Sequence, residues 1–430
     1  MKLLNYTSNN FWELLDEHLS LRQVETSSKI EDDVKLIIEN VKKFGDDKII
    51  EFAKDFDKIF IKKNEIKISN LKKFYSLDEL NKETLDSFKV AIKNIKKFHE
   101  KQIPENYEVI NMNSRLQSIW KPIDSVGLYI PGGKAVYPSS LIMSVIPAQI
   151  AGVKRIVCVT PPANNLNPYL SFLLDELGIN EVYQVGGAQA IAALAYGTAT
   201  IKPVNKIFGP GNAYVAAAKK QVFGKVGIDL VAGPSEIIVV ADDDNNPEWV
   251  ASDLMAQAEH DENAQSILIT DSKVFADKVL NKIENLKNKL SKKATIKLSL
   301  EKHGLIILID DISLSHEIIN KIAPEHLHLQ SSESEEILQK VNNAGGIFLG
   351  NYSTEAFGDY VAGTNHILPT SGAAKFSSGL GVIDFMKKSS LVEINEKSFN
   401  QLSKHVENIA DVENLDAHKL SVTIRQTKQN

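Results

Sequence analysis

The chain has few of the groups that build the commonest covalent and metal sites. Cys158 is the only cysteine among 430 residues, so no internal disulfide and no site made of several thiolates can form. Such low cysteine usage is typical of a reducing compartment. Any bound metal ion would have to be held by histidine, carboxylate or amide groups.

Basic charge and long apolar runs are also scarce. The formal net charge is −6 and the only arginines are Arg22, Arg115, Arg155 and Arg425, which argues against nucleic acid or an anionic membrane as a partner. No run approaches the length of a membrane-spanning helix, and the first twenty residues lack the apolar stretch of a signal peptide. We therefore expect a soluble cytoplasmic protein.

Hydrophobic periodicity divides the chain into three parts. Residues 1–115 have apolar positions three and four apart, which predict amphipathic helices such as 30–44 and 80–98, the first ending at Gly45. From residue 116 to 240, and again to about 380, short apolar strands alternate with helices. Strands are expected at 125–130, 154–160, from 181, from 205, and at 266–270, 304–309 and 345–349. This rhythm predicts an α/β fold with doubly wound parallel sheets.

Glycine-containing turns are the first chemical signal. Four are expected after strands, at Pro131-Gly132-Gly133, Gly186-Gly187-Ala188-Gln189, Gly209-Pro210-Gly211-Asn212 and Gly233-Pro234-Ser235-Glu236. None matches the dinucleotide fingerprint G-x-G-x-x-G or a Walker A loop. One such turn usually serves only to reverse the chain, but four together favour a binding face at the carboxyl ends of strands.

Histidines are the second signal, because eight of the ten follow residue 250. Gln257 and His260 are three residues apart in a helical pattern and so share a helix face. Asp359 and His366 bracket a glycine-containing loop. Neither arrangement is a close-spaced zinc signature such as H-E-x-x-H, so local spacing alone leaves a metal site open.

The segment Ala323-Pro324-Glu325-His326-Leu327-His328 has two interpretations. On an extended backbone His326 and His328 face the same side, as in some zinc hydrolases. Alternatively, Glu325 and His326 are adjacent proton-transfer groups of different pKa, which suits a reaction that removes more than one proton.

Taken together, the motifs resemble those of the histidinol dehydrogenase family over about residues 25–425. The matching segments occur in the family's order: GLYIPGG, VGGAQAIAALAYGT, KIFGPGNAYV, AGPSE, LMAQAEHD, APEHL, GDYVAGTNHILPT and LDAHK. The resemblance implies oxidation of L-histidinol to L-histidinal and then to L-histidine, the last step of histidine biosynthesis, with NAD⁺ and one zinc ion per subunit.

The resemblance also implies roles for particular residues. Glu325 would activate water and His326 would be the general base. Zinc would be held by Gln257, His260, Asp359 and His418. The substrate would contact these four residues and also Ser235, His326, His366 and Glu413. NAD⁺ would contact Tyr129, Gln189 and Asn212. His328 matches no functional position of the family, which weakens the hydrolase interpretation.

The implied architecture is two incomplete Rossmann-like domains with small helical extensions at both ends. Residues 1–22 would form a helical arm, 23–128 with 233–378 the first domain, 129–232 the NAD-binding domain, and 379–430 a C-terminal extension. The family forms homodimers in which this extension reaches the neighbouring site, so Glu413 and His418 would serve the partner subunit.

Two alternatives to the dehydrogenase remain distinguishable. A zinc hydrolase would need no NAD⁺, and a metabolite-binding module would bind its ligand without turnover.

Aldehyde oxidation by NAD-dependent enzymes often uses a catalytic cysteine. Cys158 lies in the apolar segment KRIVCVT and is expected to be a core residue, so water must be the nucleophile.

Overall fold

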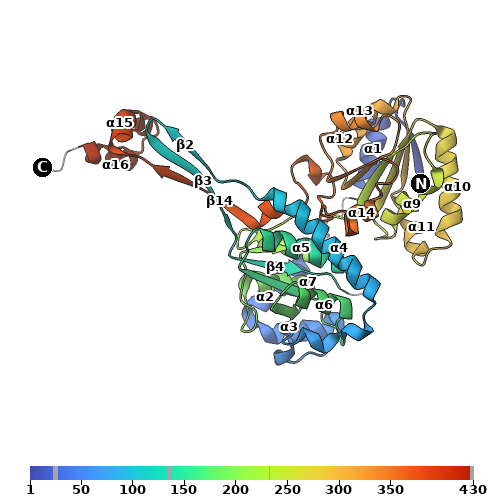
Figure 1. Ribbon diagram of the computed structural model, residues 1–430, viewed down its shortest axis with the longest axis horizontal. Coiled ribbons are helices and arrows are strands. Elements are labelled where there is room, and N and C mark those ends of the chain that lie inside the picture. The colour runs from blue at the N-terminus through green and yellow to red at the C-terminus, as the bar shows by residue number, and fades with distance from the viewer. Residues whose placement is uncertain (23–27, 133–136, 232, 427–430) are drawn as a thin grey trace.

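The structure is a computed structural model that describes residues 1–22, 28–132, 137–231 and 233–426. Two parallel sheets lie in separate bodies, and a narrow ribbon carries the C-terminal helices away from both (Figure 1). No described helix has the length and apolar character needed to cross a membrane. Gly133, in the first predicted glycine turn, lies outside the described residues.

The five-stranded sheet has the order β6-β5-β4-β7-β8 and all its pairs are parallel. Its strands are nearly continuous apolar segments, as expected for strands covered on both faces. They are β4 (Ser125–Tyr129), β5 (Arg155–Thr160), β6 (Glu181–Gln184), β7 (Lys206–Phe208) and β8 (Gly227–Ile228). The crossover helices are α5 (Pro138–Ile150), α6 (Pro168–Glu176), α7 (Gly187–Tyr196) and α8 (Ala213–Val222).

The N-terminal helices also cover this sheet. α2 (Ser28–Phe44) packs against α7 and α8, with α3 (Asp46–Phe52) beside it, and α4 (Lys82–His99) packs against α5. The expected division placed residues 23–128 with residues 233–378, but the apolar faces of these helices join the core of the five-stranded sheet. We therefore propose that residues 28–104 belong with the five-stranded sheet.

The six-stranded sheet has the order β1-β11-β10-β9-β12-β13, again entirely parallel. Residues 1–22, expected as a helical arm, supply edge strand β1 (Lys2–Asn5) before α1 (Phe11–Ser20). The other strands are β9 (Glu236–Val240), β10 (Gln265–Thr270), β11 (Leu305–Leu308), β12 (His326–Leu329) and β13 (Gly346–Leu349). The helices are α9 (Pro247–Ala258), α10 (Lys273–Lys287), α11 (Lys293–Lys302), α12 (Ser315–Ile322), α13 (Ser334–Lys340) and α14 (Glu355–Tyr360).

An antiparallel ribbon forms the third part. It contains β2 (Tyr107–Asn111), β3 (Ser114–Pro122) and β14 (Met386–Glu393) in the order β14-β3-β2. The sequence did not predict these strands. Their tip carries α15 (Glu396–Val412) and α16 (Asp416–Gln426), which lie far from both sheets (Figure 1). Many apolar side chains on this arm are exposed, including Ile110, Val392, Ile409 and Val412.

Candidate active site

Glu325 and His326 lie where α12 turns into β12. α12 ends at Ala323, which adopts a left-handed conformation with φ 54°, and Pro324 then leads into the strand. Both side chains are buried, and Glu325 Oε2 lies 3.6 Å from His326 Nδ1. The Glu236 N–H donates to Glu325 Oε2 at 3.0 Å, and His326 Nδ1 lies 3.2 Å from the Glu236 carbonyl oxygen. The two predicted proton-transfer groups are therefore held by one neighbouring residue.

Burial sets the protonation of this pair. Loss of solvation raises the pKa of Glu325 well above its usual range and lowers the pKa of His326 to about 3. Burial therefore favours the neutral imidazole of His326 and makes Glu325 a stronger base than an exposed carboxylate. His326 Nε2 has no hydrogen-bond partner among the described residues, although Glu355 Oε1 and Asp359 Oδ1 each lie 3.8 Å away. A buried ring nitrogen without a partner is free to accept a proton from a ligand.

A cluster suited to a cation adjoins His326. Ligand atoms of His260, Glu355 and Asp359 all lie within 4.8 Å of one another. Gln257 is in contact with Glu355: in the amide orientation that satisfies both ends, its nitrogen donates to Glu355 Oε2 at 2.7 Å and its oxygen accepts from the Glu236 N–H at 2.9 Å. The side chains of three of the four predicted zinc ligands, Gln257, His260 and Asp359, therefore lie together, and the Gln257 amide would have to turn over to direct its oxygen at a metal ion.

The electrostatics of this cluster favour a bound cation. Burial raises the pKa of Asp359 to about 7, and burial together with neighbouring carboxylates raises the pKa of Glu355 well above its usual range. A divalent ion would reverse both shifts by stabilising the ionised carboxylates. Gln257 and His260 also stand at the C-terminal end of α9, where the helix dipole is negative. An imidazole, carboxylates and an amide oxygen form a donor set that fits zinc.

His366 connects this cluster to the five-stranded sheet. Its Nδ1 lies 3.1 Å from the Asp359 carbonyl oxygen, and its Nε2 lies 3.1 Å from Ser140 Oγ on α5. Burial lowers the pKa of His366 to about 4, so this ring is also neutral. His366 therefore stands at the junction of the two sheet domains.

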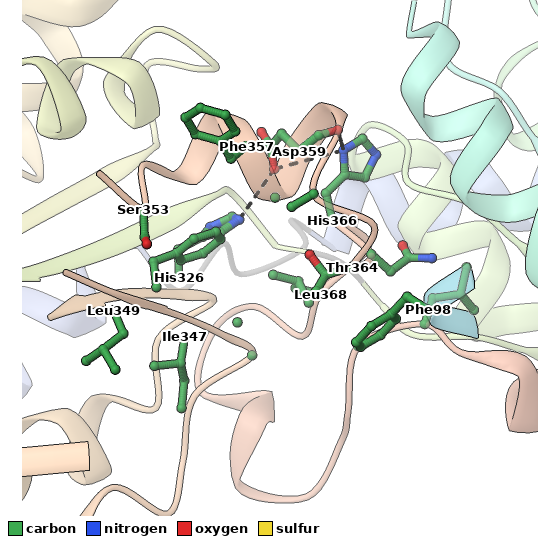
Figure 2. Close-up of a pocket in the computed structure, with 18 of the residues that line it drawn as sticks. Phe98, His326, Ile347, Leu349, Ser353, Phe357, Asp359, Thr364, His366 and Leu368 are labelled. Atoms are coloured by element: carbon green, nitrogen blue, oxygen red, sulfur yellow. Dashed lines mark hydrogen bonds and ion pairs between the residues drawn. The ribbon is translucent and has the colours of Figure 1, made fainter. Parts of the chain in front are cut away.

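A cavity of ≈ 680 Å³ opens beside these groups. His326, Asp359 and His366 gather on one side of it, and the side chains of Phe98, Ile347 and Leu368 lie across from them (Figure 2). This combination of an apolar enclosure with a few convergent polar groups is typical of a small-molecule site.

The predicted NAD⁺ contacts lie at the carboxyl ends of strands in the five-stranded sheet. Tyr129 ends β4, and its hydroxyl oxygen accepts from the Gly187 N–H at 3.1 Å at the start of α7. Gln189 is buried in the first turn of α7, and Asn212 caps α8 by accepting from Tyr214 N–H. The sheet order reverses between β4 and β7, and ligands of doubly wound sheets bind at such a point.

A buried ion pair fixes the turn at Gly209. The Gly209 N–H donates to Asp229 Oδ2 at 2.8 Å, Lys219 Nζ donates to the Gly209 carbonyl at 3.1 Å, and Lys219 and Asp229 form an ion pair with each other. Gly209 has φ +111°, and a Cβ there would lie 2.2 Å from the Tyr129 carbonyl oxygen. Only glycine fits this turn.

The fourth predicted glycine turn is placed differently from the expectation. Gly233-Pro234-Ser235-Glu236 leads into β9, so it lies at the amino end of a strand and not at a carboxyl end. The turn is the connection from the five-stranded to the six-stranded sheet. Ser235, the predicted substrate contact, therefore stands next to Glu236, whose N–H donates to Glu325.

Glu413 and His418 do not join the site within one chain. Glu413 caps the end of α15 and His418 lies on α16, and both side chains are exposed at the tip of the arm, far from α14 (Figure 1).

His328 lies outside the site because its side chain is already engaged elsewhere. It is fully buried, and its two ring nitrogens contact Gly350 O at 3.0 Å and Asp253 Oδ2 at 3.2 Å. The H-x-H interpretation therefore has no second free ligand.

Three residues of the site went unrecognised in the sequence. Glu355 sits in the cluster four residues before Asp359, a spacing on one helix face that could have been noticed. Glu236 is the last residue of the AGPSE motif. Arg22 contacts Glu236, but 214 positions separate them and no local pattern connects them.

Known proteins resemble this chain along nearly its full length. The family model described as histidinol dehydrogenase matches residues 20–426. Histidinol dehydrogenase of Brucella suis biovar 1 (strain 1330) is 45% identical over 403 residues, which cover 93% of this chain and 94% of that protein. The enzyme of that name from Clostridium acetobutylicum is 45% identical over 412 residues, covering 95% of each. The crystal structure of histidinol dehydrogenase from Elizabethkingia anophelis superimposes with a TM-score of 0.93 at 35% identity, covering 99% of this chain and 98% of that one.

Proposed function

Since the chain belongs to the histidinol dehydrogenase family and acts in histidine biosynthesis, we propose that His326 and Glu325 carry out its two successive oxidations. The substrate would be L-histidinol, and L-histidinal the enclosed intermediate. The observation that carries this proposal is the unpartnered Nε2 of His326, which is buried and directed towards the carboxylate cluster at the cavity (Figure 2).

His326 acts as general base in the alcohol step. Its neutral ring accepts the proton of the substrate hydroxyl at Nε2 while the carbinol carbon loses a hydride. NAD⁺, when bound, accepts that hydride, and one molecule is reduced in each step. The Glu236 carbonyl oxygen beside Nδ1 stabilises the imidazolium that forms.

Glu325 acts in the aldehyde step. As a carboxylate it removes a proton from water while the water oxygen adds to the aldehyde carbon, and it then returns that proton to the former carbonyl oxygen, which gives the hydrate. After His326 has released the first proton to solvent, it takes the hydrate's hydroxyl proton as the second hydride leaves, and the product is a carboxylic acid. Cys158 supplies no nucleophile, because it is buried in β5 and burial raises the pKa of its thiol. Enclosure by the apolar wall of the cavity retains the reactive aldehyde between the steps.

One zinc ion per subunit would be held by Gln257, His260, Asp359 and His418 of the partner subunit. When bound, it supplies positive charge that orients substrate nitrogens. Glu413 of the partner subunit and this chain's Ser235 and His366 would complete the substrate site. The exposed apolar side chains of the arm support a homodimer in which α16 reaches the neighbouring site. Tyr129, Gln189 and Asn212 would position NAD⁺.

Paired variants test the catalytic assignment. Glu325→Gln should slow oxidation of added histidinal much more than oxidation of histidinol to the aldehyde, whereas His326→Asn should slow both. NADH formation measures the two steps separately. A Glu325→Gln protein that oxidises histidinal at the wild-type rate would remove Glu325 from the mechanism.

Mixed dimers test the shared site. His326→Asn and His418→Asn chains should each be inactive alone. After unfolding and refolding together, half of the dimers are mixed and each has one complete site, so about a quarter of wild-type activity should return. If the mixture stays inactive although mixed dimers form, the site is not shared.

A further inference from the structure

Arg22 is a buried cation that reaches the back of the candidate active site. Its side chain is 7% exposed, and each of its nitrogens has a partner. Nη2 donates to the carbonyl oxygens of Pro234 at 2.8 Å and Ser235 at 3.2 Å, Nη1 lies 3.5 Å from Glu236 Oε2, and Nε donates to the Asn263 carbonyl at 3.1 Å. Three successive residues, 234–236, are thus held by one guanidinium group.

Glu236 connects this arginine to the catalytic pair. Its carboxylate, 4% exposed, lies between Arg22 and the backbone N–H of Ser371, which donates to Oε1. Its backbone faces the other way: the N–H donates to Glu325 Oε2 and the carbonyl oxygen contacts His326 Nδ1. The position of one residue therefore determines the orientation of both proton-transfer groups.

We propose that the Arg22–Glu236 ion pair is a positioning device, which fixes the Ser235-Glu236 segment and through it aligns Glu325 and His326. The inference rests on the proposed function, since it assigns the pair to those two catalytic groups. Arg22 is suited to this task because its planar fork holds several acceptors in fixed directions, which a lysine ammonium cannot do. Misplacement of catalytic groups by about 1 Å can cost about 10²-fold in rate.

The test compares two arginines that each pair with a glutamate and hold backbone carbonyl oxygens, one with a side chain 7% exposed (Arg22) and one with a side chain 23% exposed (Arg155). Arg155 pairs with Glu181 through two hydrogen bonds of 2.8 and 2.9 Å and also holds two backbone carbonyl oxygens, those of Lys202 and Pro203. It begins β5, at the sheet end opposite the predicted NAD⁺ turns. Arg155→Met therefore removes an arginine–glutamate pair that is more exposed, without touching residues 234–236.

We expect Arg22→Met to lower kcat for oxidation of added histidinal by about 10²-fold while KM for NAD⁺ and zinc content stay at wild-type values. Arg22→Lys should restore part of the rate. Arg155→Met should lower the melting temperature but leave kcat within about twofold, because it breaks an arginine–glutamate pair elsewhere.

The double variant Arg22→Met/Glu236→Gln adds a second criterion. An unpaired buried carboxylate is strongly destabilising, so its neutralisation should recover stability lost in Arg22→Met without recovering kcat. If Arg22→Met cannot be obtained folded, Arg22→Lys and Glu236→Gln still decide the question through the same kcat measurement.

The proposal is overturned if folded Arg22 variants keep kcat within about twofold of wild type, or if they lose zinc along with activity. Equal rate losses in Arg22→Met and Arg155→Met would also overturn it, since the effect would then be one of general stability. His326→Asn is measured beside them. Wild-type rates in that variant would refute the proposed function itself, whereas an inactive His326→Asn with active Arg22 variants refutes only the positioning role.

Discussion

The two parallel sheets have the same strand order but present opposite ends to the site. Numbered in chain order, the strands β4 to β8 and β9 to β13 both lie in the order third, second, first, fourth, fifth, with β1 added at one edge of the second sheet. In the five-stranded sheet, Tyr129 and the Gly209 turn stand at carboxyl ends. In the six-stranded sheet, Glu236 and His326 stand at amino ends.

Helix dipoles explain why each end suits its ligand. At carboxyl ends of strands the following helices begin, and the positive N-termini of α7 and α8 suit the pyrophosphate of NAD⁺. At amino ends the preceding helices finish, and the negative C-terminus of α9 carries Gln257 and His260, which suits a cation. One topology therefore supplies one end suited to an anion and one end suited to a cation when two copies face each other by opposite ends.

Loss of the cation site should have the largest effect. His260→Asn should leave the protein with little zinc and lower kcat by at least about 10³-fold, because the metal contributes several kcal/mol. NADH binding, measured by fluorescence, should stay unchanged because the other sheet is untouched. His316→Asn, on α12, is the matched control. A His260→Asn protein with full zinc content would contradict the assignment.

A change in the Gly209 turn should weaken NAD⁺ binding without affecting zinc binding. Gly209→Ala should raise KM for NAD⁺ by about 10²-fold, since the added Cβ would collide with the Tyr129 carbonyl and move the turn. Zinc content should not change. Gly224→Ala is the control, because Gly224 also has positive φ, +96°, but no described atom lies within 4 Å of its Cβ position. Equal effects of both substitutions would show that backbone strain, not the turn, is responsible.

Loss of the buried Lys219–Asp229 ion pair, which holds the Gly209 turn, should have a smaller effect on KM for NAD⁺. Lys219→Met leaves Asp229 without its cation and releases the Gly209 carbonyl, so KM for NAD⁺ should rise by about tenfold. Lys220→Met removes the neighbouring, exposed lysine that pairs with Glu31, and it should change nothing. If KM for NAD⁺ rises in both variants, or in neither, the Lys219–Asp229 ion pair has no specific role in NAD⁺ binding.

A buried histidine beside the six-stranded sheet should contribute to acid sensitivity. Burial lowers the pKa of His303, next to β11, from 6.5 to about 4. Below pH 6.5 this histidine binds a proton in the unfolded chain but not in the folded chain. Proton binding therefore favours the unfolded chain, and the free energy of unfolding falls as the pH decreases towards 4. His303→Gln should reduce the loss of unfolding free energy over that range by at most about 1 kcal/mol. Identical pH profiles for variant and wild type would contradict this.

The smallest effect is expected at Cys158. Cys158→Ala should keep both oxidation steps within about twofold and cost about 1 kcal/mol in unfolding free energy, because a small core group is removed. Selective loss of histidinal oxidation in this variant would indicate that the Cys158 thiol is the nucleophile after all.

Local patterns in the sequence predicted seven of the fourteen described strands and helices such as α2 and α4. β5 was predicted as 154–160 and spans Arg155–Thr160, and α4 was predicted as 80–98 and spans Lys82–His99, because apolar periodicity is a property of neighbouring residues. The ribbon was missed because β3 pairs with β14, about 270 positions away, and β2 exposes side chains on both faces. Such strands lack the alternation that marks a half-buried sheet.

The site follows the same division. Gln257 with His260, and Glu325 with His326, were visible because each pair is close in the chain. Their approach to Asp359 and Glu355, and the contact of Arg22 with Glu236, depend on residues 29 to 214 positions apart. The glycine turn before β9 was assigned to the wrong end of a strand because it crosses from one sheet to the other, and a turn motif carries no information on which sheet its next strand joins.

The sequence by itself determined the chemistry available to this protein: no usable thiol, histidines gathered in the C-terminal half, and alternating strands and helices that fold as parallel sheets. The tertiary structure decided which ends of those sheets face each other and which buried groups become neighbours. The physical reason is that element formation depends on local periodicity and burial. The protonation of Glu325 and His326 and the grouping of the metal-binding residues depend instead on desolvation and contacts that only the packed chain creates.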